Sequence, residues 1–240
     1  MGIIDKLAKS IATHAKVINK TKVAEHTFRL SIQLQGPHAF SYRPQDFLRI
    51  LVGMDQQAPL RDRVRSYSIW NFDTLTQTLD LAVCTFSNGP GANWINSVNI
   101  GDDVYFMKHS SNLIINNDTD DAVMIGDISA LGHLYGLRRF YRNQDRVSGY
   151  IFGKDQADFF SDIDGHSPFR FITAAPQQYQ TIISTVAAAL PRPTNNTIIY
   201  VAGDGEMCKW LYKHLKNQLG WSNKQIRVKP FWIQGKKGLE

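Results

Sequence analysis

Short runs of alternating apolar and polar residues dominate the first half of the chain. Between about residues 17 and 112 they are separated by turn residues such as Gly36-Pro37 and Gly101-Asp102. Alternation with a period of two is typical of β-strands that bury one face, and five or six short strands at this spacing predict a small antiparallel barrel. The expected strands are 27–34, 46–52, 65–70, 78–86 and 103–108, with one helix at 91–98.

The pattern changes at the polar segment 116–121, where we place the boundary between two domains, 1–116 and 117–240. Beyond it, apolar strand-like runs alternate with segments of helical period, which is the order of a parallel, doubly wound sheet with helices on its faces. We therefore predict a six-stranded antiparallel barrel followed by an α/β domain. In the second domain we expect strands at 122–126, 147–152, 169–173, 197–203 and 226–232, and helices at 129–142, 177–190 and 204–219.

Two helical stripes also stand out. Residues 2–16 predict a short helix packed on the body of the protein, and a membrane-surface anchor is the less favoured alternative because the apolar face is narrow and lacks aromatic residues. The members of this stripe are Ile3, Ile4, Leu7, Ala8, Ile11 and Ala15. In the last expected helix the residues predicted to share one face are Met207, Trp210, Leu211, His214 and Leu215.

Composition narrows the function classes. The 240 residues carry a net charge of +6, which favours anionic partners, but no Lys/Arg cluster of the kind that binds nucleic acid is present. The two cysteines, Cys84 and Cys208, lack the spacing of a zinc or iron–sulfur site, and the seven histidines show no metal-ligand grouping. The cysteines and histidines therefore predict a reducing, cytoplasmic setting and no metal site. Because no apolar run of 18 residues is present, we also expect no stable membrane insertion.

The strand around residues 63–72 combines charge with aromatic surface. Arg65 and Tyr67 are two residues apart and therefore project from one face of a strand. A guanidinium there can bind a pyrophosphate, the tyrosine ring can stack on a planar heterocycle, and Ser68 can add a hydrogen bond. The alternative from these residues alone is an edge strand with a solvated arginine and a packed tyrosine.

A tight turn at 88–94 precedes the helix expected in the first domain. Backbone N–H groups at such a helix start favour phosphate, although an ordinary strand–helix turn has the same glycine-rich composition. The second domain lacks the G-x-G-x-x-G dinucleotide fingerprint, since 126–132 reads GDISALG and 203–208 reads GDGEMC. The sequence motifs therefore do not establish a binding site for a nicotinamide dinucleotide.

Taken in order, these motifs resemble those of siderophore-interacting proteins, the FAD-dependent ferric-siderophore reductases of the ferredoxin-reductase-like superfamily. The family's R-x-Y-[ST] strand is similar to residues 65–68, and its G-P-A-x-x-W helix start is similar to 89–94. Its G-D-E-T-A-L segment resembles 126–131. Three shorter matches follow the same order, at 100–102, 201–204 and 231–235.

The resemblance implies a role for each matched residue. Arg65 would bind the FAD phosphates, Tyr67 would stack on the isoalloxazine, and Ser68 would hydrogen-bond near its N5. Thr85 replaces a family histidine and would contact the flavin through its backbone. The other implied FAD contacts are Gly91, Ala92, Asn93, Ser129, Ala130 and Trp232.

On the substrate side the family uses basic residues to meet an anionic ferric siderophore. Arg49 matches a basic position in a family strand, whereas Lys108, Lys236 and Lys237 are candidates by neighbourhood only, with a solvated surface as the alternative. Phe86, Ile128 and the segment 108–111 depart from the family pattern. No nucleophile–base pair is evident, so we assign no catalytic side chain, consistent with electron transfer through a cofactor.

The resemblance therefore implies a ferric-siderophore reductase that uses FAD, with NAD(P)H or reduced ferredoxin as electron donor. One alternative is a general NAD(P)H–flavin or ferredoxin-type reductase without a siderophore role. Another is a non-enzymatic flavin-binding redox partner. The sequence does not distinguish the siderophore, the donor or the oligomeric state.

Overall fold

The computed structural model describes most of the chain as two compact units. These units are Met1–Asn112 and Leu113–Glu240. The expected boundary at 116 lies outside the described residues, so the division into an FAD-binding domain and an NAD(P)H-binding-like domain at that point stays a prediction. The described residues are 10–36, 40–53, 63–87, 89–111, 121–175, 178–194 and 196–235.

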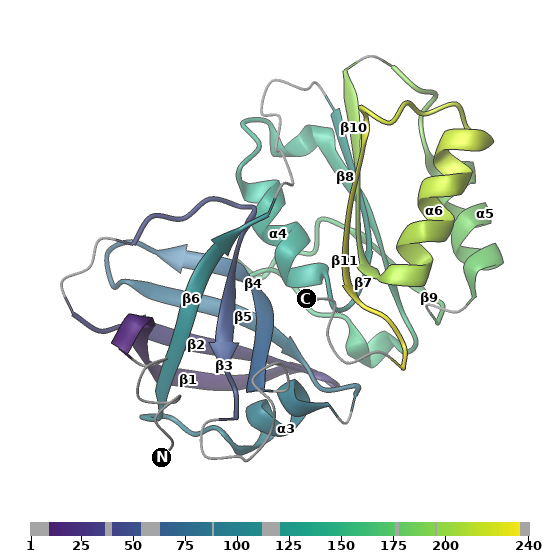
Figure 1. Cartoon of the computed structure of the whole chain (residues 1–240). Helices are drawn as coiled ribbons and strands as arrows, with labels where there is room; N and C mark the ends of the chain where they lie inside the picture. The colour runs from purple at the N-terminus through teal and green to yellow at the C-terminus, as the bar shows by residue number, and fades with distance from the viewer. Residues whose placement is uncertain are drawn as a thin grey trace. The chain divides into compact units, whose positions relative to one another are not determined.

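Six antiparallel strands close the first unit into a barrel (Figure 1), in the order β1-β2-β5-β4-β3-β6. This confirms the predicted six-stranded barrel. A helix, α3 (Pro90–Ser97), follows β5, also as predicted. The strands are β1 (Thr13–Ala24), β2 (Thr27–Leu34), β3 (Asp46–Leu51), β4 (Val64–Asp73), β5 (Thr78–Cys84) and β6 (Asp103–Ser110).

The N-terminal helix predicted for 2–16 is wrong over its last residues, because Thr13 already begins β1. Residues 1–9 lie outside the described part of the chain. In β1, Ala15 and Val17 point into the core while Lys16 and Ile18 are exposed. Pairing of β1 with both β2 and β6 closes the barrel, so this strand owes its conformation to partners distant in sequence.

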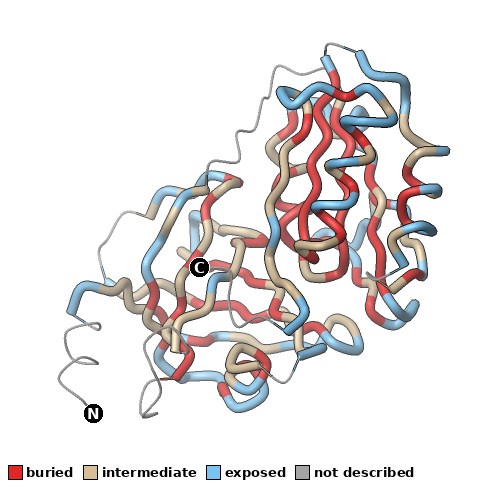
Figure 2. Tube along the Cα trace, turned by 45° about the vertical axis from the view of Figure 1, so that its right-hand side comes forward, coloured by how far each residue is buried: buried red, intermediate tan, exposed pale blue. Residues whose placement is uncertain are grey.

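The barrel core is filled by the inward residues of each strand, which appear as alternating buried positions along the tube in Figure 2. Leu48 and Ile50 of β3 and Ile69 of β4 are fully buried. Helix α3 adds Ile95 to the same core. The start of α3 is thereby held against the barrel by apolar packing.

Five parallel strands form the second unit, in the order β11-β10-β7-β8-β9. The predicted α/β fold is confirmed, with the expected strands and helices in place. Two short 3-10 helices, Gln144–Arg146 and Gln156–Asp158, are additional. The strands are β7 (Asp121–Asp127), β8 (Val147–Gly153), β9 (Arg170–Thr173), β10 (Thr197–Asp204) and β11 (Ile226–Trp232), and the helices are α4 (Leu131–Arg139), α5 (Tyr179–Ala189) and α6 (Gly205–Asn217).

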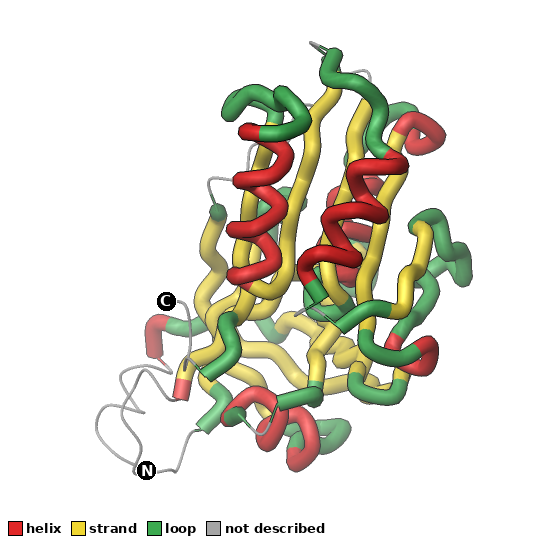
Figure 3. The backbone as a smooth tube through the Cα atoms, turned by 90° about the vertical axis from the view of Figure 1, so that its right-hand side faces the viewer, coloured by secondary structure: helices red, strands yellow, loops and turns green. Residues whose placement is uncertain are grey.

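Helices cover both faces of this sheet, α4 on one side and α5 with α6 on the other (Figures 1 and 3). Met207, Leu211 and Leu215 of α6 are buried against the sheet as predicted. Trp210 departs from the predicted face: 45% of it is exposed, and its ring stacks on Tyr179 of α5 with 5.8 Å between centroids. The narrow contact of a helix with a flat sheet explains the difference, since a residue at the stripe's edge faces the neighbouring helix.

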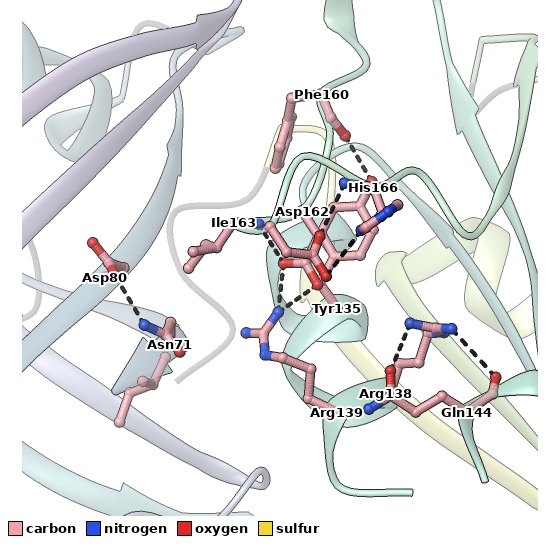
Figure 4. Close-up of polar contacts among 12 residues, drawn as sticks. Asn71, Asp80, Tyr135, Arg138, Arg139, Gln144, Phe160, Asp162, Ile163 and His166 are labelled. Atoms are coloured by element: carbon pink, nitrogen blue, oxygen red, sulfur yellow. Dashed lines mark hydrogen bonds and ion pairs between the residues drawn. The ribbon is translucent and has the colours of Figure 1, made fainter. Parts of the chain in front are cut away.

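Buried carboxylates in each unit are satisfied by local donors. Arg139 of α4 pairs with Asp162, and the Tyr135 hydroxyl donates to the carbonyl of Phe160 at 2.7 Å (Figure 4). In the barrel, Asp80 accepts from Arg29, Ser31 and the side-chain amide of Asn71; Figure 4 draws the last of these contacts. These networks hold loops and strands in register.

None of the helices within the described ranges is long and apolar enough to cross a membrane.

Candidate functional site

Strand β4 brings Arg65 and Tyr67 to one face, as the alternation predicts. In its antiparallel pairing with β3, Arg65 lies opposite Ile50 and Tyr67 opposite Leu48. Directly opposed residues share a face, so both side chains lie on the core side of the barrel wall. There Tyr67 packs at the border of the core, with its ring centroid 5.8 Å from that of Trp94 in α3.

The start of α3 lies directly against these two side chains. A Cβ atom added to Gly91 would come well within 3.0 Å of the Tyr67 hydroxyl and 3.7 Å from Cγ of Arg65. Only glycine therefore fits here without displacing the tyrosine. The structure brings together an arginine, a tyrosine and a helix start that the sequence separates by more than 20 residues.

The first turn of α3 offers backbone donors to a ligand. Pro90 is at the first helical position and has no N–H, and the N-cap Gly89 contributes no side-chain cap. The N–H of Asn93 donates to the carbonyl of Gly89 at 3.0 Å, as the first bond within the helix. Gly91 and Ala92 precede that bond, so of the three amides predicted from the resemblance these two are the ones the helix leaves available.

Strand register separates the other predicted residues from this cluster. Arg49 of β3 lies opposite Ser66, and Ser68 lies opposite Phe47, so these four side chains belong to the outer face of the barrel wall. On the same outer face the ring of Phe47 stacks on that of His109 in β6, with 5.6 Å between centroids. Arg49 and Ser68 thus share a surface with each other and not with Arg65.

Lys108 is held by contacts inside the barrel unit. Its ammonium donates to the carbonyl of Ser41 at 2.7 Å and lies 3.4 Å from the fully buried carboxylate of Asp46. An anionic chelate would have to compete with Asp46 for this charge. Lys236 and Lys237 lie outside the described residues. The half-buried Thr85 follows β5, and its N–H donates to the carbonyl of His26 at 2.7 Å.

The sheet of the second unit has a switch point between β7 and β10. The strand order reverses between these two strands, and open α/β sheets bind ligands in the crevice at such a switch point. Asp127 ends β7 and Asp204 ends β10, and both are almost fully buried. Asp204 caps α6 by accepting the N–H groups of Glu206 and Met207 at 2.7 and 3.0 Å.

Asp127 connects the end of β7 with the ends of β10 and β11 and accepts four hydrogen bonds. One carboxylate oxygen accepts the backbone N–H of Ser129 at 2.8 Å and also its hydroxyl. The other accepts the N–H of Asp204 at 2.7 Å and the indole N–H of Trp232 at 3.2 Å. Burial raises the pKa of Asp127, and the donors from Ser129, Asp204 and Trp232 oppose that rise. All four partners are donors, which suits the ionised carboxylate.

Sequence motifs assigned Ser129, Ala130 and Trp232 but missed Asp127 as the residue that joins them. The available signal was a buried acid at the end of a strand, within the G-D segment at 126–127. Ala130, which precedes α4, is fully buried, so its side chain contacts protein rather than solvent. Ser129 and Trp232 are half-buried and remain open to contact with a ligand.

His133 is a second buried titratable group in this unit. It is 3% exposed, its two ring nitrogens have no hydrogen-bond partner, and its ring lies 5.5 Å from that of Phe231. Burial, together with the nearby charge of Lys229, lowers the pKa of His133 well below its usual value. Across the ranges that the structure describes, no group of three or more His, Cys, Asp or Glu side chains is placed to hold a metal ion.

Two family models match the chain in sequence order. Residues 14–109 match the oxidoreductase FAD-binding domain, and residues 119–235 match the siderophore-interacting protein model. The second unit therefore matches the siderophore-interacting protein family, and the unit before it matches an oxidoreductase FAD-binding domain. The resemblance read from the motifs at 65–68, 89–94 and 126–131 is thereby confirmed.

Known members and neighbours of the siderophore-interacting family agree with this assignment. Ferric vibriobactin reductase ViuB of Vibrio cholerae is 22% identical over 178 residues, which are 72% of this chain and 65% of that protein. The chain thus spans somewhat less than two thirds of this curated relative. The structure of the siderophore-interacting protein SipS from Aeromonas hydrophila has a TM-score of 0.76 at 18% identity, over 94% of this chain and 92% of that one.

Ferredoxin reductases have a similar fold. The ferredoxin-NADP+ reductase from Plasmodium falciparum has a TM-score of 0.73 at 14% identity, covering 92% of this chain and 96% of its own. At this identity the likeness shows architecture alone. The two-unit arrangement of barrel and parallel sheet is therefore common to siderophore-interacting proteins and ferredoxin reductases.

The barrel residues suit the FAD that the matched domain implies. Gly91 leaves open the space that a Cβ would fill beside Tyr67, and the amides of Gly91 and Ala92 lie at a helix start, where anions bind favourably. Arg65 adds a positive charge next to the same turn. This donor set matches a pyrophosphate attached to a flat ring system.

Proposed function

We propose that this protein is an FAD-dependent reductase that converts Fe(III) to Fe(II) in a ferric siderophore. The observation that carries the proposal is the contact of Arg65 and Tyr67 with the α3 start at Gly91, within a unit that matches an FAD-binding domain. The match of the second unit to the siderophore-interacting model supports the choice of substrate. The name of the relative ViuB, a ferric vibriobactin reductase, points to the same chemistry.

Bound FAD would supply the electrons that reduce the metal. The chain's own residues would bind and orient the cofactor: Arg65 and the amides of Gly91 and Ala92 would hold its phosphates, and Tyr67 would offer a flat apolar surface to its ring. The hard oxygen ligands of siderophores hold Fe(III) more firmly than Fe(II), so reduction favours release of the metal.

Arg49 is proposed to attract an anionic chelate toward the barrel, from the face of the wall opposite Arg65 and Tyr67. Arg49 lies there with Ser66, Ser68 and the stacked pair of Phe47 and His109. The net charge of +6 attracts an anion over a longer range. Apparent affinity for the chelate should accordingly fall as salt rises from 0.05 to about 0.5 M. An affinity that does not change with salt would show that neither Arg49 nor the net charge attracts the chelate.

The electron donor is proposed to be NAD(P)H or reduced ferredoxin. The crevice at the carboxyl ends of β7 and β10 is the position where α/β sheets bind nucleotides, which supports NAD(P)H. Likeness in fold to a ferredoxin-NADP+ reductase suggests the second donor. Steady-state oxidation of NADH, NADPH and reduced ferredoxin, each with one ferric chelate, would separate these donors.

The proposed function is tested by mixing photoreduced, FAD-loaded protein anaerobically with a ferric siderophore. Flavin reoxidation should coincide with Fe(II), trapped by ferrozine. The gallium(III) complex of the same siderophore is the matched control, because it has the same charge and shape but does not accept an electron. Reoxidation by ferredoxin or free flavin without any by ferric chelates would instead support a general reductase, and bound FAD that no acceptor reoxidises would support a non-enzymatic redox partner.

A further inference from the structure

The carboxyl ends of three parallel strands meet at one buried acid. Asp127 ends β7, Asp204 ends the neighbouring β10, and Trp232 ends β11, one strand further out. The indole of Trp232 therefore reaches past β10 to donate to Asp127 at 3.2 Å. The carboxylate also accepts both donors of Ser129, in the turn that precedes α4.

Glycine at position 203 allows this arrangement. Gly203 lies on β10 with a φ of 121°, and an added Cβ would come within 2.6 to 2.7 Å of both carboxylate oxygens of Asp127. A side chain here would push the carboxylate away from the indole, and the backbone conformation itself disfavours other residues. The approach of Asp127 to Trp232 is thus built into the end of β10.

The donors around Asp127 make its position specific. Two of them act on each oxygen, one from the backbone and one from a side chain. A buried carboxylate that is ionised requires such donors, since burial alone would expel the charge. Loss of both oxygens as acceptors would leave the indole N–H of Trp232 and the backbone N–H groups of Ser129 and Asp204 without this partner.

We propose that Asp127 is a positioning residue, which sets the indole of Trp232 and the hydroxyl of Ser129 for the reaction through its buried carboxylate. This inference rests on the proposed function and on the motif resemblance, which assigns Ser129 and Trp232 a role beside the flavin. Asp127 itself touches no ligand in this account. Its contribution is the orientation of two half-buried side chains at the switch point of the sheet.

The first experiment reads the position of Trp232 without any cofactor. The chain has five tryptophans, so protein labelled with 5-fluorotryptophan gives five ¹⁹F resonances, and the Trp232→Phe variant assigns one of them. Asp127→Ala removes both acceptor oxygens and should shift and broaden the Trp232 resonance alone. Asp204→Asn is the control, because it also removes a buried negative charge from these strand ends but leaves a good N-cap on α6. An unchanged Trp232 resonance in Asp127→Ala, or an equal shift in the control, would overturn the proposal.

The second experiment reads the reaction. With FAD bound, Asp127→Ala and Trp232→Phe should each slow flavin reoxidation by a ferric chelate about tenfold, and the double variant should be no slower than either. A double variant slowed by the product of the two factors, or a normal rate in Asp127→Ala despite a displaced indole, would refute the role. If the wild-type protein failed to bind FAD or reduce chelates, the proposed function would fail, while the ¹⁹F result would still decide whether Asp127 positions Trp232.

Discussion

Replacing Gly91 by Ala is the sharpest test of the site in the barrel. The new Cβ would lie well within 3.0 Å of the Tyr67 hydroxyl, whereas ordinary contacts between heavy atoms are about 3.5–4.0 Å. The hydroxyl must therefore move by roughly 1 Å, and the ring must turn with it. The carbon that bears the hydroxyl, Cζ, would be 3.6 Å from the new atom, which is an ordinary contact.

This displacement should weaken cofactor binding while leaving the fold intact. A shift of about 1 Å in a ring that stacks on the flavin is expected to raise the Kd for FAD about 10- to 100-fold, or about 1.4–3 kcal/mol. Alanine in the first turn of α3 would, by itself, stabilise the helix by up to about 1 kcal/mol relative to glycine. The Kd for FAD should thus rise while the free energy of unfolding of the apoprotein stays constant or increases.

FAD titration monitored by flavin fluorescence, with thermal unfolding in parallel, measures both effects. Gly89→Ala is the matched control in the same turn, since its Cβ would be 3.4 Å from the Ser87 hydroxyl and meets no part of Tyr67. Tyr67→Phe removes the clashing atom, so the double variant Gly91→Ala/Tyr67→Phe should bind FAD as well as Tyr67→Phe alone. Wild-type affinity in Gly91→Ala, or a double variant as weak as Gly91→Ala, would show that Tyr67 does not bind FAD next to Gly91.

Three further predictions concern charge. Arg65→Ala should reduce FAD affinity by about 1.5–3 kcal/mol in the same titration, and an unchanged Kd would remove Arg65 from the site. The pKa of His133 is lowered by burial, so only the unfolded chain binds its proton just below pH 6.5. The free energy of unfolding should therefore fall, as the pH is lowered through this range, by up to about 1.4 kcal/mol per pH unit. Urea titrations at pH 8.0, 6.0 and 5.0 measure this slope, and His133→Leu should lose the part that His133 contributes. Asp80→Asn should destabilise the barrel by about 2–3 kcal/mol in chemical denaturation because it breaks a buried network, whereas Asp103→Asn, which is half-exposed, should cost less than about 1 kcal/mol; equal losses would contradict the assigned networks.

Local periodicity was enough to predict most of the secondary structure. The strands around 27–34 and 197–203 read correctly because alternation or continuous apolar character reflects only which face a strand buries. Strand β1 was missed for two reasons. Ala15 continues the helical stripe of the apolar residues before it, and Val17 lies between Lys16 and Lys20, so neither shows a clear alternation. Its conformation depends on pairing Thr13 with Phe106, more than 90 residues away.

The candidate site likewise has features that local sequence spacing predicts and features that depend on contacts between distant segments. That Arg65 and Tyr67 share a face could be predicted from the sequence, because it follows from a spacing of two residues on one strand. The contact of Gly91 with both of them and the position of Arg49 on the opposite face could be seen only in the folded chain. The meeting of Trp232 with Asp127 was likewise invisible in the sequence. A strand's faces are set by local geometry, whereas the register of paired strands and the convergence of strand ends are set by contacts between distant segments.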